Sequence, residues 1–369
     1  MKYFLIAGEA SGDLHASNLI HALRTRDAEA EFIGLGGDKM RAEGCELLQD
    51  YRKMAFMGVL AVLANLRTIR QNFRIAKEGL LREQPDVLIL IDYPSFNLKI
   101  ARFCKEHLPH TRVVYYIPPK IWAWKTWRVH AIARYSDLIL GIFPFEPAFY
   151  AKYGYQCTYV GNPTMDSIRA WKQANSVLSE REKVIALLPG SRPSEIRHCL
   201  PVMLAAAREV CPPDYRIAVT AAPGIDDCFY ARYLQGEELT RNTYALVSRA
   251  EAAVVNSGTA TLETALLGCP QTAVYYIALA RYLGWLKPLI FRIPHFTLVN
   301  IIPGREVIRE LVAFHFTKRD IRTELTRLLG DQDYRARMEA DYRDINNILG
   351  NQPAAENAAR IITELTPAT

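Results

Sequence analysis

The sequence lacks any pair of cysteines at the C-x-x-C spacing that is typical of zinc sites and redox centres. Its seven cysteines are scattered, so we predict neither a metal site nor a disulfide framework, and free thiols are typical of the reducing cytosol. The chain also lacks a long hydrophobic segment: residues 54–66 are too short to cross a bilayer, and residues 3–7 are too short for a secretion signal. We therefore expect a cytoplasmic protein that is soluble or bound to a membrane surface without crossing it.

A strong excess of charge is absent as well. The chain has 45 Lys and Arg residues against 39 Asp and Glu residues, which gives a formal net charge of +6. This mild basic excess favours anionic substrates or an anionic membrane surface, but it is too small to indicate nucleic-acid binding. Half of the 369 residues are apolar and 23% are charged, which argues against disorder, and this length suits two α/β domains with separate cores.

The start of the chain predicts the strand–turn–helix unit of a doubly wound α/β domain. Residues 3–7 are an apolar strand, and residues 8–13 form a glycine-bearing turn into a helix around residues 14–23. The turn does not match G-x-G-x-x-G, so a dinucleotide site is not indicated. In such a domain the ligand crevice lies at the carboxyl ends of the strands, and we expect this turn to face it.

The clearest central strand of the first half spans residues 86–92 and ends at Asp92. A carboxylate at the carboxyl end of a buried strand lies where α/β enzymes hold reactive groups. The alternative is a simple helix N-cap, and the strand pattern alone leaves both open. The next strand, residues 112–117, is followed by Trp122 and Trp124, which either wall a substrate cleft or pack in the core.

Residues 54–63 (MAFMGVLAVL) are unusually apolar for a connection in an α/β domain. The helix expected next, over residues 66–80, already presents an apolar face to cover the sheet, and its basic residues form an adjoining stripe. An apolar segment beside basic residues can lie in a membrane interface, whereas the alternative is core packing. We predict that the segment is exposed and that Phe56, Met57 and Leu60 contact a membrane.

The second half of the chain repeats the strand–turn–helix pattern at two places that suit phosphate binding. Residues 184–188 predict a buried strand, and the turn after it carries Arg192 beside a helix start, where its guanidinium can grip a diphosphate. Residues 252–255 predict another strand, and residues 256–259 form the turn into a helix over residues 261–267.

The second of these turns is the stretch most typical of a nucleotide site. Its helix start offers unpaired backbone N–H groups and a positive dipole end to a phosphate. Gly258 allows close approach of a ligand, and Ser257 and Thr259 offer hydroxyl donors. Glu263, one turn further along, can accept hydrogen bonds from sugar hydroxyls. The alternative is an ordinary capped junction without a ligand.

Two doubly wound halves with glycine-bearing turns aimed at a shared cleft suggest a GT-B glycosyltransferase. Six motifs in a fixed order narrow this further, and together they resemble the lipid-A-disaccharide synthase family over residues 3–312. The motifs are GEASGD at 8–13, IDYPSFN at 91–97, IWAW at 121–124, LLPGSR at 187–192, SGTATLE at 257–263, and Asn300 with GRE at 304–306.

The resemblance implies an α/β fold of the GT-B type, with two doubly wound Rossmann-like domains facing a central cleft. We expect an N-terminal domain for the acceptor and its lipid at residues 1–165 and a C-terminal domain for the nucleotide sugar at residues 166–345. A C-terminal helix at residues 346–369 can pack back on the first domain. The weakly helical, polar stretch at residues 166–179 is the expected connection between the domains.

This family makes lipid A disaccharide for lipopolysaccharide: it joins UDP-2,3-diacylglucosamine to 2,3-diacylglucosamine 1-phosphate through a β-1′,6 bond, with inversion, and releases UDP. The resemblance implies that Asp92 is the catalytic base, that Arg192 stabilises the leaving diphosphate, and that no cofactor or metal takes part. The implied nucleotide-binding residues are Arg192, Ser257, Gly258, Thr259, Ala260 and Glu263, and the implied substrate-binding residues are Ser11, Gly12, Trp122, Asn300 and Arg305. Expected partners are the two acylated sugars and the cytoplasmic face of the inner membrane, bound peripherally. Nucleic acid is not expected, and a homodimer is one option for assembly.

Three positions depart from the family pattern. Lys120 stands where a small polar residue is frequent, Ser95 where many members have a second aspartate, and Asn162 where a histidine is common. Because residue 95 carries no carboxylate, the base role is expected of Asp92 alone.

Two other functions stay open at this point. One is another GT-B enzyme of UDP-sugars, such as a UDP-N-acetylglucosamine 2-epimerase or a cell-wall N-acetylglucosaminyltransferase, and the other is a non-catalytic lipid-binding protein.

Overall fold

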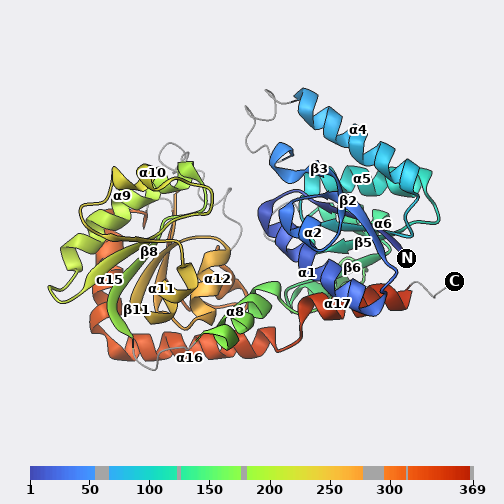
Figure 1. Ribbon diagram of the computed structural model, residues 1–369. Coiled ribbons are helices and arrows are strands. Elements are labelled where there is room, and N and C mark those ends of the chain that lie inside the picture. Colours follow the sequence, from blue (N-terminus) through green and yellow to red (C-terminus); the bar gives the residue numbers. More distant parts are fainter. Residues whose placement is uncertain (55–65, 123–125, 176–180, 277–294, 313–314, 366–369) are drawn as a thin grey trace. The chain divides into compact units, whose positions relative to one another are not determined.

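The computed structural model of the chain describes all residues except 55–65, 123–125, 176–180, 277–294, 313–314 and 366–369. The chain divides into two compact units (Figure 1). Unit 1 comprises Met1–Pro163 together with Asn351–Thr369, and unit 2 comprises Thr164–Gly350. The chain therefore passes from unit 1 to unit 2 and returns to unit 1 for its last helix.

Unit 1 is built on a seven-stranded parallel sheet with the order β3-β2-β1-β4-β5-β6-β7. Its central strands, such as β1 and β4, are near-continuous apolar runs because helices cover both faces of this parallel sheet. The strands are β1 (Lys2–Ala7), β2 (Glu31–Gly36), β3 (Glu46–Asp50), β4 (Val87–Ile91), β5 (Arg112–Tyr116), β6 (Leu138–Gly141) and β7 (Thr158–Tyr159).

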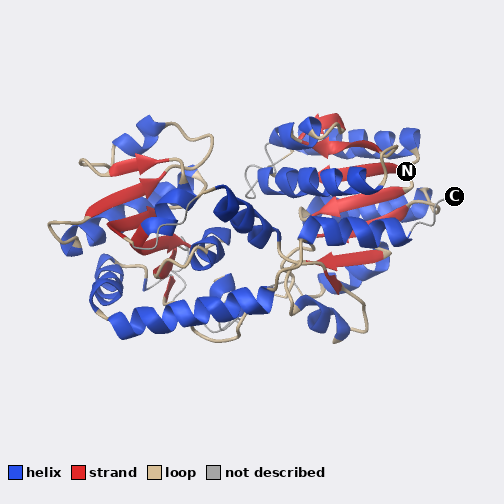
Figure 2. Ribbon diagram, turned by 60° about the horizontal axis from the view of Figure 1, so that its bottom comes forward, coloured by secondary structure: helices blue, strands red, loops and turns tan. Residues whose placement is uncertain are grey.

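Helices cover both faces of this sheet (Figure 2). Alternate side chains of β1 divide between the two faces: Tyr3 and Leu5 pack with α1 and α17, whereas Phe4 and Ile6 pack with α4. One face carries α1 (Ala10–Arg26), α2 (Asp38–Ala42) and α17 (Ala354–Leu365), and the other carries α4 (Leu66–Glu83), α5 (Pro94–His107), α6 (Arg128–Tyr135) and α7 (Glu146–Ala151). A short 3-10 turn, η1 (Tyr51–Lys53), follows β3.

The last helix, α17, belongs to the core of unit 1. Its Ala358, Ala359 and Ile362 are buried in the same cluster as Leu19 and Leu23 of α1, and Figure 1 shows the two helices side by side. Asn357 ties the helix to the sheet edge by donating its side-chain N–H to the carbonyl oxygen of Val160 over 3.1 Å. The C-terminal helix thus completes one layer of the first unit.

The stretch expected as the connection between domains has a different structure. Residues 163–174 form helix α8 (Pro163–Ala174), and residues 164–174 are part of unit 2. Met165 and Ile168 are spaced three residues apart and are both buried, which gives the helix a packed apolar face despite its polar composition. Residues 176–179 of the expected connection lie outside the described residues.

Unit 2 contains a six-stranded parallel sheet with the order β10-β9-β8-β11-β12-β13. Helices α9 and α15 pack on one another and on the sheet, and α11 packs with α12 against it. The strands are β8 (Glu182–Leu188), β9 (Arg216–Thr220), β10 (Glu238–Thr240), β11 (Ala250–Asn256), β12 (Gln271–Tyr275) and β13 (Glu310–Val312). The helices after α8 are α9 (Pro193–Val210), α10 (Asp227–Ala231), α11 (Thr243–Arg249), α12 (Thr259–Leu266), α14 (Leu298–Ile301), α15 (Lys318–Gly330) and α16 (Gln332–Leu349).

Each sheet has one point where the order of its strands reverses. In unit 1, β1 pairs with both β2 and β4, and in unit 2, β8 pairs with both β9 and β11. At such a point the connections leave in opposite directions, which opens a crevice beyond the carboxyl ends of the two central strands. Both units are therefore doubly wound, as predicted, and these strand ends carry four of the six motifs.

Candidate active site in two halves

The half of the candidate site in unit 1, which we expected to receive the acceptor and call the acceptor half, begins where the carboxyl ends of β1 and β4 meet. A Cβ atom added to Gly8 would lie 2.4 Å from the ring of Tyr93, so only glycine lets the two turns come this close. The hydroxyl of Tyr93 donates to the carbonyl oxygen of Met54 over 2.7 Å, which fixes the ring against which Gly8 rests. The turn at residues 8–13 consequently lies beside Asp92.

Asp92 follows β4 in a backbone conformation that is rare for residues other than glycine. Its φ is +45°, and Tyr93 follows with a φ of +44°. Each left-handed residue of this kind costs on the order of 1–2 kcal/mol, and such strain persists only where surrounding contacts fix the chain. Here the carbonyl oxygen of Asp92 accepts from the hydroxyl of Tyr115 at 2.7 Å and from the Nδ2 of Asn97 at 2.8 Å, and its N–H donates to Ile117 at 3.1 Å.

The side chain of Asp92 is exposed and is not used as a helix cap. Helix α5 begins at Pro94 with Tyr93 as the preceding residue, and no side chain caps its first turn. Although the carboxyl group reaches solvent, the surrounding protein raises its pKa, and the charge of Lys120 and the Tyr93 N–H oppose that rise. An accessible carboxylate with a raised pKa suits proton transfer better than an ordinary surface aspartate.

Glu146, which the sequence analysis did not single out, is a second carboxyl group in this half. It begins α7 and is only 1% exposed, and its Oε2 accepts from the N–H groups of Ile142 and Phe143 at 2.7 and 2.9 Å. Its Oε1 accepts from Nε1 of Trp122 at 3.3 Å. Burial raises the pKa of Glu146 to about 7, and these three hydrogen bonds, followed by the charge of Lys120, oppose the rise only in part. In the sequence, the one sign that Glu146 is buried is the apolar run Ile-Phe-Pro-Phe that directly precedes it.

The motif at residues 8–13 supplies one accessible group and two structural ones. Ser11 is exposed in the first turn of α1, in keeping with the substrate contact expected of it. Gly12 is buried, and a Cβ there would touch the Cβ of Ala7 at 3.4 Å, which favours a packing role over a substrate contact. Asp13 is buried too, and its carboxylate accepts from the N–H groups of Gly37 and Met40 at 2.8 and 3.1 Å, which caps α2.

The half of the candidate site in unit 2, which we expected to bind the nucleotide sugar and call the donor half, forms where the loop after β8 meets the end of β11. Gly190 has a φ of +120°, and a Cβ there would lie 2.6 Å from Oε2 of Glu195 and 2.7 Å from Nδ2 of Asn256. The glycine lets the two strand ends touch, as the strand order requires. Arg192 occupies the N-cap position of α9, where its half-exposed guanidinium contacts Glu195 with Nη1 and Oε1 2.9 Å apart.

The turn after β11 presents an open helix start. The N–H of Ser257 donates to Val274 at 2.7 Å, and this bond anchors the turn to β12. Gly258 is the N-cap residue of α12, and a Cβ added to it would meet no protein atom within 4 Å. Thr259 is exposed and Ala260 half-buried, and both lie in the first helical turn, whose N–H groups have no partner within a helix. The arrangement leaves room for an anion at this terminus.

Glu263 lies on the same helix as this open turn. Its Oε1 accepts from the hydroxyl of Tyr244 at 2.8 Å, and burial raises its pKa. The bond to Tyr244 holds the side chain in one orientation and leaves acceptor capacity on the carboxyl group. This placement suits the predicted contact with a sugar hydroxyl.

The predicted substrate contacts of Asn300 and Arg305 are not supported by their surroundings. Asn300 is fully buried: its Nδ2 donates to Ile308 at 2.9 Å, and its Oδ1 accepts from Val307 and Ile308 at 2.8 and 3.0 Å. Because both ends of the amide are used inside the protein, Asn300 holds the 300–308 loop in shape, and its predicted substrate contact stays a prediction. Arg305 is exposed and forms ion pairs with Asp341 and Asp344 of α16.

The predicted membrane contacts cannot be placed. Phe56, Met57 and Leu60 lie outside the described residues, as does Trp124, whereas Met54 at the start of the segment is buried. In the described part of the chain, no helix combines the length and apolar character that a bilayer span needs. The same residues contain no group of three His, Cys, Asp or Glu side chains arranged to hold a metal ion.

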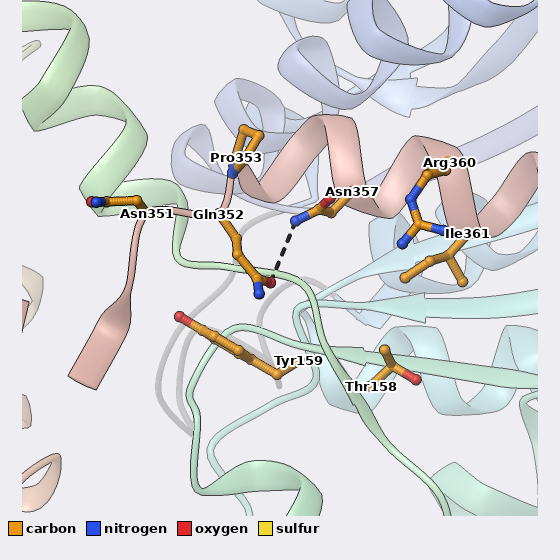
Figure 3. Close-up of a pocket in the computed structure, with 8 residues that line it drawn as sticks. All are labelled: Thr158, Tyr159, Asn351, Gln352, Pro353, Asn357, Arg360 and Ile361. Atoms are coloured by element: carbon orange, nitrogen blue, oxygen red, sulfur yellow. Dashed lines mark hydrogen bonds between the residues drawn. The ribbon is translucent and has the colours of Figure 1, made fainter. Parts of the chain in front are cut away.

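A cavity of about 520 Å³ lies beside β7, the strand at one edge of the unit 1 sheet (Figure 3). It is formed by β7, the segment before α17 and α17 itself, and it contains none of the predicted site residues. Its lining residues are Thr158, Tyr159, Asn351, Gln352, Pro353, Asn357, Arg360 and Ile361. Because it lies away from the β1–β4 junction, this cavity is separate from the acceptor half.

Comparisons with solved structures agree with this fold. The Staphylococcus aureus MnaA–UDP co-structure matches with a TM-score of 0.68 at 11% identity and covers 99% of this chain and 96% of its own. A calicheamicin glycosyltransferase matches with a TM-score of 0.60 at 14% identity, covering 100% and 99%. A UDP-GlcNAc 2-epimerase of Neisseria meningitidis, bound to UDP-GlcNAc, matches with a TM-score of 0.59 at 12% identity, covering 99% of each chain. At these identities the likeness shows the GT-B fold alone.

Comparisons of sequence decide the family. The family model described as lipid-A-disaccharide synthetase matches residues 3–364. A lipid-A-disaccharide synthase of Myxococcus xanthus is 36% identical, with 99% of this chain and 98% of the relative covered. Another, of Syntrophus aciditrophicus, is 37% identical, with 96% and 95% covered. The chain is therefore a hexosyltransferase that belongs to the lipid-A-disaccharide synthase family, as the six motifs predict.

Proposed function

We propose that the two halves carry out the reaction of this family as an acceptor half and a donor half. UDP-2,3-diacylglucosamine condenses with 2,3-diacylglucosamine 1-phosphate to give the β-1′,6-linked disaccharide 1-phosphate and UDP. The β1–β4 junction of unit 1 receives the acceptor, and the β8–β11 junction of unit 2 receives the UDP-sugar. The observation that carries this assignment is the accessible Asp92 carboxylate, which a strained and firmly held turn presents at the end of β4.

Asp92 acts as the general base on the acceptor. The primary hydroxyl of a sugar is a weak nucleophile, and a carboxylate within hydrogen-bond reach removes its proton as the new bond forms. The hydroxyl oxygen attacks the anomeric carbon from the side opposite UDP, so the configuration inverts in one displacement and no covalent intermediate is required. The fixed backbone of Asp92 holds the carboxylate in place for this single proton transfer.

The donor half stabilises the charge that develops on the leaving UDP. As the glycosidic bond breaks, negative charge gathers on the diphosphate, and preorganised cationic and N–H groups lower the barrier without a metal ion. Arg192 supplies a guanidinium, and the start of α12 supplies the N–H groups of Thr259 and Ala260 with the positive end of the helix dipole. Glu263, held by its bond from Tyr244, accepts a hydrogen bond from a hydroxyl of the nucleotide sugar.

The enzyme works at the cytoplasmic surface of the inner membrane, because both substrates keep their acyl chains in the bilayer. Helices α4, α5 and α6 lie on one face of unit 1 and have far more basic than acidic residues, which suits an anionic lipid surface. The basic residues are Arg67, Arg70, Arg74, Lys77, Arg82, Lys99, Arg102, Lys105, Arg128 and Arg134, against Glu78, Glu83 and Glu106. The apolar segment at residues 55–65 directly precedes α4 and adds side chains that can enter the interface.

A two-substrate assay tests the proposal. The purified protein is mixed with both acylated sugars in phospholipid–detergent micelles, and UDP release is followed alongside formation of the disaccharide. We expect UDP only when both sugars are present. Release of UDP from the donor alone would indicate a hydrolase or an epimerase-like activity, and tight binding of the lipids without any UDP release would indicate a non-catalytic lipid-binding protein.

A further inference from the structure

Glu146 joins two loops that leave neighbouring strands. The first loop, residues 117–122, follows β5 and carries Lys120 and Trp122, and the second, residues 142–145, follows β6. The two oxygens of Glu146 are used separately: Oε2 accepts both backbone N–H groups of the second loop, and Oε1 accepts the indole N–H of Trp122 in the first. The carboxyl group therefore links the two loops through hydrogen bonds.

Aromatic packing strengthens this connection at Trp122. Its ring packs edge-to-face with the rings of Phe143 and Phe145, at centroid distances of 5.9 and 5.0 Å. Ile121, the residue between Lys120 and Trp122, is buried in the core of unit 1. Ile121 and Trp122 are therefore both held in place by packing, and this fixes the backbone of the residue before them, Lys120.

Lys120 is placed to act on Asp92. The strands β4, β5 and β6 are consecutive neighbours in the sheet, so Asp92, Lys120 and Glu146 follow the carboxyl ends of three adjacent strands. The surrounding protein raises the pKa of Asp92, and the positive charge of Lys120 opposes that rise. The surrounding protein likewise lowers the pKa of Lys120, and the charges of Asp92 and Glu146 oppose that fall. The other titratable groups coupled to Glu146 are Tyr150 and Cys157, which are neutral at physiological pH because burial raises the pKa of each.

We propose that Glu146 is a positioning residue for the acceptor half: through Trp122 it fixes the loop that carries Lys120 at the strand end next to Asp92, and so keeps a positive charge in the neighbourhood of the base. This inference rests on the proposed function, in which Asp92 is the base. It gives Lys120, a departure from the family pattern, a defined task in this chain. It also gives a function to a carboxyl group that lies in an apolar site where its charge is disfavoured.

The variant Glu146→Gln distinguishes the bond to Trp122 from the bonds to the 142–145 loop. A glutamine can direct its one oxygen at the backbone N–H groups of Ile142 and Phe143, but its NH₂ group then faces the indole N–H of Trp122, and two donors cannot bond. Only the bond to Trp122 is lost. Trp122→Phe removes the same bond from the other end while the carboxyl group keeps both backbone bonds, so it serves if Glu146→Gln does not fold.

The decisive readout is the acidic limb of the pH profile of kcat/KM. Loss of a cation beside a carboxylate raises its pKa by about one unit or more, so Lys120→Met moves this limb to higher pH by about that amount. Glu146→Gln and Trp122→Phe move it in the same direction, and Glu146→Gln combined with Lys120→Met moves it no further than Lys120→Met alone. The KM for the UDP-sugar stays unchanged in all of them, because the donor binds unit 2.

The matched control is Glu324→Gln. Glu324 is another buried glutamate that accepts a bond from an aromatic side chain, the hydroxyl of Tyr334 at 2.6 Å, but it lies in unit 2 on α15. It is expected to lower the melting temperature without moving the acidic limb. An unmoved limb in Lys120→Met, or a Glu146→Gln variant that loses stability and kcat with no shift of the limb, overturns the inference. Full activity of Asp92→Asn would instead overturn the proposed function itself.

Discussion

The hydroxyl of Tyr115 donates a 2.7 Å hydrogen bond to the backbone carbonyl oxygen of Asp92. Tyr115 is fully buried in β5, so the neighbouring strand anchors the turn that carries the proposed base. Asn97, one helical turn into α5, bonds the same oxygen at 2.8 Å and the carbonyl of Ile91 at 3.2 Å. Both residues bond the backbone of Asp92 and not its carboxylate.

We predict that Asp92→Asn abolishes most of the turnover and leaves binding of the UDP-sugar intact. Asparagine keeps the shape and hydrogen-bonding capacity of the side chain but cannot take a proton, and loss of a general base typically costs about 10²–10⁴-fold in rate. Initial rates with both sugars, together with calorimetric titration of UDP-sugar, check this. Retained activity would move the base role to Glu9, because Asp13 is committed to capping α2.

The anchor itself can be tested with Tyr115→Phe. Removal of the hydroxyl leaves the strained turn with one bond fewer, so we expect a loss of about 1 kcal/mol in unfolding free energy and a several-fold fall in kcat. Tyr150→Phe is the matched control, because Tyr150 is fully buried in the same core and its hydroxyl has no hydrogen-bond partner among the described residues. Equal effects of both substitutions on kcat would contradict the role of Tyr115.

Arg192→Ala is expected to lower kcat by about 10²–10³-fold, the usual cost of removing one preorganised group that stabilises developing charge. The structure places the guanidinium at the N-cap of α9 and half exposed, so the substitution leaves the fold intact. Steady-state kinetics with a melting curve measure both quantities. Arg197→Ala provides the control, since Arg197 is an exposed arginine on the same helix; a loss of similar size there would argue for a general charge effect.

The raised pKa of Glu146 predicts how the stability of the protein changes with pH. The group is protonated up to a pH of about 7 in the folded protein and up to a pH of about 4.5 in the unfolded chain, so the folded state binds more protons between these values. This group therefore lowers the stability as the pH rises from about 4.5 to 7, by about 3 kcal/mol in total.

Glu146→Gln removes this dependence. Denaturant unfolding at pH 5 and pH 8 should show the variant less stable than the wild type at pH 5, where it has lost the Trp122 bond. Its deficit should shrink or reverse at pH 8, where the wild type carries a buried charge. A difference between the two proteins that does not change with pH would show that the carboxyl group titrates normally.

We predict that replacing Phe56, Met57 and Leu60 together with serine moves the protein from the bound to the free fraction of vesicles that contain phosphatidylglycerol. Apolar side chains that enter the interface contribute roughly 25 cal/mol per Å² of buried surface, and serine removes this. Ile348→Ser, a change at an exposed isoleucine of unit 2, should leave binding unaltered. Unfolding of the triple variant, or unchanged vesicle binding, would count against the membrane role of this segment.

The sequence by itself determined the strands, the turns after them and the family. Apolar runs such as residues 87–91 can only be buried, and turns that carry glycine and polar residues must follow them at the surface. Because the motifs are local, the sequence could place Asp92, Arg192 and the start of α12 at strand ends as candidates, whereas their roles were implied only by the resemblance to the family, which the comparisons confirm. The same reasoning could not separate Asn300 from the accessible polar residues, since an amide looks alike in sequence whether it meets a substrate or a buried loop.

Only the tertiary structure decided which strand ends lie together and what each polar side chain touches. The strand order puts Gly8 against Tyr93 and Gly190 against Asn256, across sequence separations that no local pattern bridges. The same order brings Glu146 to the loop of Trp122, so a glutamate without any motif becomes part of the acceptor half. Periodicity reports burial along one element, whereas the site arises from hydrogen bonds between elements, and these depend on sheet order and loop geometry that emerge only when the whole domain packs.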